Sequence, residues 1–193
     1  MYRRFLIALV ATGGLAACGA DQPPADPSPA PGARPAAYGL RGLTRATASG
    51  RPVAGLRCAA AARPTAWVHI EIFDHGRVVL LPSGIGIAPP RRTTGAYVRG
   101  GRCRYPLWTD EPTGLVAVTR SGLRLGDLFR VWGRALDDNR VAAFRGAVTA
   151  HVDGTKATTP PQDIPLTPHA QIVLQVGGPL VTPHAAYRFP PNR

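Results

Sequence analysis

The sequence is poor in acidic residues and in lysine, and it carries no common catalytic motif. It has 11 Asp and Glu residues against 23 Lys and Arg residues, and Lys156 is its only lysine. The Gly-x-Ser-x-Gly, Ser-x-x-Lys and His-Glu-x-x-His patterns and the glycine-rich phosphate loop are all missing from it. Asp110 and Glu111 are adjacent carboxylates, but neighbours on an extended chain point to opposite faces. The sequence therefore favours a protein that is not an enzyme.

Long apolar runs are also missing, apart from one near the start. Residues 5–17 are apolar or small, and they are too few for the roughly 20-residue span that a bilayer helix needs. They end in Leu15-Ala16-Ala17-Cys18, which resembles the bacterial lipobox, where the cysteine receives a diacylglyceryl group. The pattern predicts a lipoprotein signal peptide over residues 1–17 and a lipidated Cys18. An ordinary secretory signal that contains a cysteine is the alternative.

The residues after Cys18 predict a tether and then one domain. Residues 18–38 are rich in proline and alanine, lack an apolar period, and are typical of an extended linker. Residues 39–193 have the normal size of a single globular domain. In lipoproteins of Gram-negative bacteria an aspartate after the lipidated cysteine usually directs retention in the inner membrane. In a Gram-negative cell, Gly19 therefore favours a location on the outer membrane, facing the periplasm.

Only two cysteines, Cys58 and Cys103, remain beyond the lipobox. In an oxidising compartment they permit one intramolecular disulfide, which would close a loop of about 45 residues. Free buried cysteines are the alternative.

Alternating patterns in residues 39–193 predict a mainly β (α+β) domain of antiparallel hairpins. Residues 66–73 place Val68, Ile70 and Ile72 on one aliphatic face. Glycine-bearing turns after strand-like runs predict hairpins, and they occur at Asp74-His75-Gly76 and Asp153-Gly154. Residues 171–176 form a further strand pattern, and the prolines between residues 160 and 168 are expected to exclude regular structure there.

One short helix is predicted near residues 125–132. Its apolar residues recur at i, i+3, i+4 and i+7 and share one face, namely Leu125, Leu128, Phe129 and Trp132. Gly133 follows as a candidate C-terminal cap.

Several landmarks together resemble a group of largely uncharacterised exported bacterial proteins, over roughly residues 55–190. The landmarks are Val68-His69-x-x-Ile72-Phe73-x-x-Gly76, Pro82-Ser83-Gly84-Ile85-Gly86-Ile87, Cys103-x-Tyr105-x-Leu107, Leu125-Gly126-Asp127-Leu128-Phe129-Arg130-Val131-Trp132-Gly133, Ile164-Pro165-Leu166 and Ile172-x-Leu174. In that group the first strand carries His-x-His, the Cys-x-Tyr segment continues into Leu-His-Thr-His, and a later strand carries another histidine. The resemblance implies a histidine-lined metal or polar site.

This sequence departs from that pattern at the histidines. In register, Trp67 replaces the first of them, Trp108 and Asp110 replace the pair in Leu-His-Thr-His, and Ala117 replaces the last, so only His69 remains. Zinc sites normally need at least three protein ligands. We therefore expect a degenerate site without metal or cofactor, in which the two indoles pack in place of imidazoles as a stacked pair. A metal-binding or metal-dependent protein that uses His69 and Asp110 with further ligands is the alternative.

The formal net charge of +12 adds a last alternative. The arginines are scattered rather than gathered in one run, and no nucleic-acid recognition motif accompanies them. A solvated arginine surface is the simplest interpretation, and a module that binds an anionic envelope glycan or lipid is the other. The leading hypothesis is a lipoprotein of the cell envelope that contacts the membrane through its lipid anchor and carries a non-enzymatic binding or structural domain.

Overall fold

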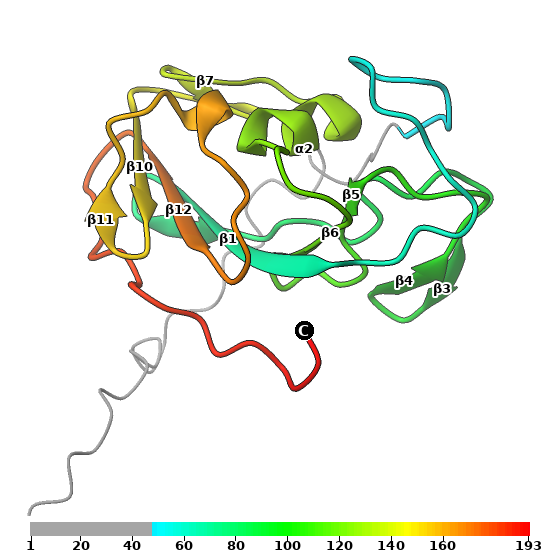
Figure 1. Cartoon of the computed structure of the whole chain (residues 1–193). Coiled ribbons are helices and arrows are strands. Elements are labelled where there is room, and N and C mark those ends of the chain that lie inside the picture. The colour runs from blue at the N-terminus through cyan, green and yellow to red at the C-terminus, as the bar shows by residue number, and fades with distance from the viewer. Residues whose placement is uncertain (1–47) are drawn as a thin grey trace, which may run out of the picture. The chain divides into compact units, whose positions relative to one another are not determined.

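The computed structural model describes residues 48–193 (Figure 1). The predicted signal peptide (1–17), the predicted tether (18–38) and Cys18 lie outside the described residues, as do residues 39–47 of the predicted domain. Within residues 48–193, no helix has the length and apolar character that a membrane crossing requires.

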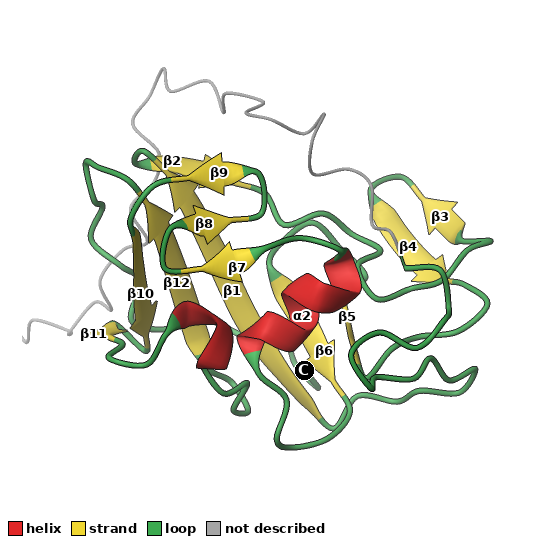
Figure 2. Cartoon of the chain, turned by 90° about the horizontal axis from the view of Figure 1, so that it is seen from above, coloured by secondary structure: helices red, strands yellow, loops and turns green. Residues whose placement is uncertain are grey.

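The prediction of a mainly β domain with one short helix is confirmed (Figure 2). Its main sheet has seven strands in the order β11-β10-β12-β1-β6-β5, with β2 paired to β1. These are β1 (Ala66–Asp74), β2 (Arg77–Val79), β5 (Leu107–Trp108), β6 (Leu115–Val118), β10 (Val148–Val152), β11 (Thr155–Lys156) and β12 (Gln171–Val176). Two smaller sheets comprise β3 (Arg92–Thr94) with β4 (Tyr97–Gly100), and β7 (Leu136–Asp137) with β8 (Arg140–Val141) and β9 (Phe144–Arg145).

Both predicted hairpin turns form. His75 and Gly76 have φ values of 48° and 73° between β1 and β2, and Asp153 and Gly154 have 51° and 77° between β10 and β11. Two successive residues with positive φ match the twist of the flanking strands, which is why glycine occupies the second position of each turn.

The central strand pair differs from the antiparallel expectation. β1 and β12 run parallel, in a register that pairs His69 with Gln171 and Asp74 with Val176. The other strand pairs of the main sheet are antiparallel. Two parallel strands are joined by a long crossover rather than a hairpin. No local turn pattern in the sequence therefore predicts their pairing.

The helix α2 (Leu125–Trp132) has the predicted bounds, and its four predicted apolar residues are almost completely buried. They pack in one core with the aliphatic face of the sheet, which includes Val68, Ile70, Ile172 and Leu174. Gly133 ends the helix in the left-handed conformation with a φ of 70°, as its position predicted.

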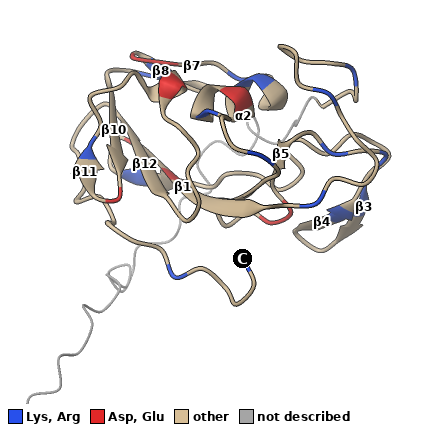
Figure 3. Ribbon diagram, viewed as in Figure 1, with Lys and Arg blue, Asp and Glu red and all other residues tan. Residues whose placement is uncertain are grey.

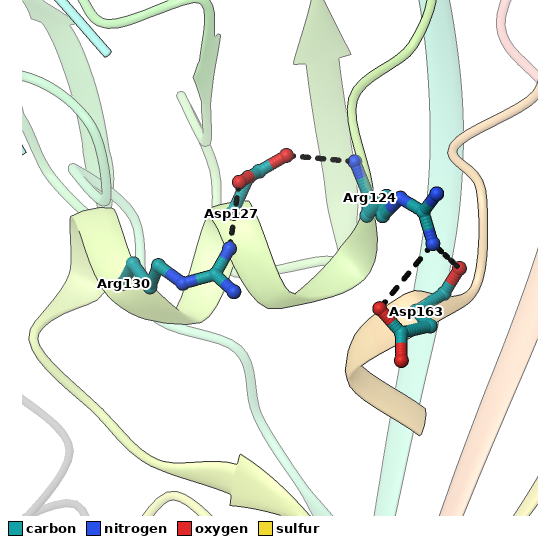
Figure 4. Close-up of polar contacts among 4 residues, drawn as sticks. All are labelled: Arg124, Asp127, Arg130 and Asp163. Atoms are coloured by element: carbon teal, nitrogen blue, oxygen red, sulfur yellow. Dashed lines mark hydrogen bonds and ion pairs between the residues drawn. The ribbon is translucent and has the colours of Figure 1, made fainter. Parts of the chain in front are cut away.

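Polar contacts fix the start of α2 (Figure 4). The Asp127 carboxylate accepts hydrogen bonds from the backbone N–H of Arg124 at 2.9 Å and from the guanidinium of Arg130 at 2.8 Å. Arg124 also reaches Asp163, 3.3 Å away, at the end of the 3₁₀ helix η1 (Pro161–Asp163). The expectation that prolines exclude regular structure here is wrong for this turn, because a proline at the first helical position loses no required hydrogen bond.

The predicted disulfide is confirmed. Cys58 and Cys103 are bonded, with 5.5 Å between their Cα atoms, within the usual span of about 4.4–6.8 Å. Two backbone hydrogen bonds between Ala59 and Arg104 lie beside it. The bridge therefore ties the segment before β1 to the segment before β5.

The second face of β1 is covered as well, which the alternating pattern did not predict. Residues 177–193, which we call the strap, contain no strand and cross this face on the side opposite α2 (Figure 1). His69, on this face, is only 4% exposed. The strap and its contacts define the candidate site.

Candidate functional site

Three of the positions at which the resemblance implies histidine lie side by side. Trp67 on β1 pairs with Ala117 on β6, and Ala117 pairs in turn with Trp108 on β5. Side chains at directly paired positions project from the same face of a sheet. The strand register of the sheet therefore brings these three residues into one row across three strands.

The two indoles do not form the stacked pair that we expected. Ala117 lies between them, and among residues 48–193 neither indole forms a ring pair with the other. Each indole face instead carries a guanidinium, with Arg193 4.7 Å from the ring centroid of Trp67 and Arg104 5.4 Å from that of Trp108. The row of Trp67, Ala117 and Trp108 is therefore apolar, and the guanidiniums of Arg193 and Arg104 cover its two indoles.

His69 is held from three sides. Its Nδ1 is 2.6 Å from Oε1 of Gln171, and its Nε2 is 2.8 Å from the backbone oxygen of Thr113. The ring of Tyr187, from the strap, stacks on the imidazole with 3.7 Å between centroids and 11° between planes. Gly114, with a φ of 88°, allows the approach from the Thr113 side, since an added Cβ would lie 2.3 Å from the backbone oxygen of Ile70.

These contacts leave the imidazole no lone pair to offer. The Thr113 oxygen can only accept, so Nε2 of His69 carries a proton. Nδ1 is engaged in turn by the side-chain amide of Gln171 at 2.6 Å. Both nitrogens are therefore occupied.

Asp110, the other proposed ligand, is not grouped with His69. Its Oδ1 lies 4.0 Å from the guanidinium of Arg104 and forms no hydrogen bond, while its backbone oxygen accepts one of 2.8 Å from Val98. Within the described part of the chain, no three His, Cys, Asp or Glu side chains gather in a way that could hold a metal ion. The residues present at this row do not fit the metal that the resemblance implies.

The strap supplies the site residues that sequence reasoning missed. Arg193 forms an ion pair with Glu111, and the ring of His184 is 2.9 Å from the carboxylate of Glu71. The amide of Gln175 bonds both backbone groups of Val181, at 3.0 and 2.7 Å. The aromatic residues of the segment Tyr187-Arg188-Phe189 were an available signal, but they have no period that predicts what they cover.

The phenol of Tyr187 sits among these charges. Burial, followed by the nearby carboxylate of Glu111, raises the pKa of Tyr187, while Arg193 acts in the opposite direction. The phenol therefore stays protonated, and its ring packs edge-on against Phe189 with 5.0 Å between centroids. The strap covers the His69 face of β1 with aromatic rings and with side chains that form ion pairs.

Comparison of the chain with protein-family models, with curated proteins and with solved structures gives no match.

Proposed function

We propose that this chain is a membrane-anchored bacterial lipoprotein of the cell envelope whose β domain has a binding or structural role and no catalytic one. The domain is built on a degenerate metal-site scaffold, in which indoles and the strap fill the place of the lost imidazoles. The lipid on Cys18 holds it to a membrane. In a Gram-negative cell this is the outer membrane, with the domain facing the periplasm.

The occupied imidazole of His69 is the observation that supports this proposal most. A ligand or catalytic base must present a free lone pair, and the contacts of Gln171 and Thr113 use both nitrogens. Tyr187 covers the ring face, so even a substrate that needed no lone pair would have to displace the strap first.

Metal content tests the degenerate site. The purified wild-type chain is expected to hold no stoichiometric zinc, copper or iron by elemental analysis. The triple variant Trp67→His, Ala117→His, Trp108→His is expected to bind about one Co²⁺ per chain, because the three new imidazoles share one row and one face. The d–d absorption bands of tetrahedral Co²⁺ report this binding.

The double variant Trp67→His, Trp108→His is the matched control. It creates the same two cavities but leaves Ala117 between two imidazoles that are two strands apart. Its Co²⁺ affinity is expected to be much weaker than that of the triple variant. About one tightly held metal ion in each wild-type chain would contradict the proposal.

The lipid anchor is tested separately. Wild-type protein from a bacterial host is expected to partition into the detergent phase, and Cys18→Ala to stay in the aqueous phase or to keep its signal peptide. The variant Cys58→Ala, Cys103→Ala is the control, since it loses two cysteines without touching the lipobox. A Cys18→Ala chain that loses residues 1–17 and still enters detergent, as mass spectrometry can show, would mean that Cys18 is not lipidated.

A further inference from the structure

The charge of the described domain is distributed unevenly. Between Asp74 and Asp110 the chain contains six arginines and no acidic residue. Five of the six fall in residues 91–104, which form the β3–β4 hairpin and its flanks, namely Arg91, Arg92, Arg99, Arg102 and Arg104. In Figure 3 the two strands of this hairpin carry basic positions and no acidic ones.

Three of these arginines are exposed and free of carboxylate partners. Within residues 48–193, no Asp or Glu forms an ion pair with Arg92, Arg99 or Arg102. Two of the three are nevertheless held in place by other contacts. Arg99 lies over the ring of Tyr97, 4.6 Å from its centroid, and Arg102 donates to the backbone oxygen of Ser49 at 2.6 Å. Both side chains are exposed, and neither a tyrosine ring nor a backbone oxygen neutralises their positive charge.

The tip of the hairpin has a different character from its base. Val98 is buried in the core, and its N–H bonds to the backbone oxygen of Asp110 at 2.8 Å, which fastens the base of β4. The neighbouring Tyr97 therefore points the other way and is 39% exposed. The connecting residues Gly95 and Ala96 are small, uncharged and exposed. The hairpin thus presents a neutral tip and one phenol beside three exposed guanidiniums that have no carboxylate partner within residues 48–193.

We propose that the β3–β4 hairpin binds the surface of a bilayer that contains anionic phospholipids. Guanidiniums pair with lipid phosphates, while a tyrosine beside a small neutral tip suits the headgroup layer, where an amphipathic ring has its apolar body buried and its hydroxyl in water. An anionic glycan would also use the arginines, but Gly95 and Ala96 at the tip have no side chain that could hydrogen-bond a sugar. The inference rests on the proposed envelope location, which puts a bilayer beside the domain.

Vesicle binding of the full chain tests this surface. The Cys18→Ala chain, in which lipid attachment plays no part, is mixed with vesicles of phosphatidylcholine alone or with about one third phosphatidylglycerol, and flotation gives the partition coefficient. Binding through the apolar residues 5–17 needs no anionic lipid. The increase in partition coefficient on adding phosphatidylglycerol therefore measures binding by the charged surface. That gain is expected to be large at low salt and small at high salt.

Variants locate the gain on the hairpin. In this background, Arg92→Gln, Arg99→Gln, Arg102→Gln is expected to lower the phosphatidylglycerol-dependent partition coefficient by on the order of a hundredfold, since each arginine near the surface contributes about fivefold. The control Arg145→Gln, Lys156→Gln, Arg188→Gln removes the same charge from exposed positions outside residues 91–104 and is expected to cost far less. Tyr97→Ser is expected to weaken vesicle binding severalfold and to leave retention on an anionic polysaccharide unchanged.

Equal losses in the two triple variants would overturn the proposal, because net charge alone would then explain binding. Retention on the polysaccharide that depends on the three hairpin arginines, with no gain from phosphatidylglycerol, would overturn it in favour of a glycan. Neither result touches the detergent partition of the wild-type lipoprotein. Conversely, a chain that is not lipidated at Cys18 can still pass the vesicle test, so the two proposals fail independently.

Discussion

Replacing Phe129 with alanine is expected to lower the free energy of unfolding by about 3–5 kcal/mol. The side chain is almost fully buried on the sheet side of α2 and packs against Trp132, with 5.4 Å between ring centroids. Removing the ring deletes its buried apolar surface and leaves a cavity that the flanking strands cannot close. A domain of this size is typically stable by only about 5–15 kcal/mol, so denaturant unfolding should show a large fall in midpoint.

Arg130→Ala is the control on the same helix. Its guanidinium is exposed and pairs with Asp127 at 2.8 Å, and surface ion pairs contribute only about 0–1 kcal/mol. In chemical denaturation, the free energies of unfolding of the two variants should therefore differ by several kcal/mol. An unchanged midpoint for Phe129→Ala would show that α2 is peripheral to the cooperative core.

Removal of the disulfide by Cys58→Ser, Cys103→Ser is expected to cost up to about 4 kcal/mol. The bond closes a loop with a sequence separation of 45 residues, and in the chain-entropy model the loss of this closure gives the unfolded chain more conformations. The measurement is again the free energy of unfolding, compared with wild type under oxidising conditions.

Reductant provides the control for this second prediction. It should lower the midpoint of the wild type toward that of the double variant and leave the double variant unchanged. If the oxidised wild-type chain exposes two titratable thiols when unfolded, the cysteines are not bridged in solution, and the expected loss will not occur.

The sequence predicted those features of the fold whose causes are local. The helix was found with its bounds because four apolar residues at helical spacing face one core and Gly133 can adopt positive φ. The hairpin turns were found because glycine follows His75 and Asp153 at the position that needs it. The β1–β12 pairing was missed because nothing within either strand encodes a partner about a hundred residues away.

The candidate site shows the same division. The resemblance implied that Trp67, Ala117 and Trp108 belong to one site, and the strand register places them in one row. The resemblance could not show that Arg193 and Tyr187 come back over Trp67 and His69, because the strap has no periodic pattern. The contacts that occupy the imidazole were therefore visible only in the structure.

The parallel pairing of β1 and β12 also sets an order of assembly. Under the export that we propose, the chain crosses the membrane from its first residues onward, and β1 emerges long before residues 171–176. One edge of β1 then stays unpaired until β12 has emerged. Cys58 and Cys103 can meet earlier, because the whole loop between them has already emerged. Oxidation can thus restrict the first half of the domain before the sheet closes, and pairings at high sequence separation are intrinsically slow to form. Completion of the sheet becomes a late step, reached only when nearly all of the domain is present.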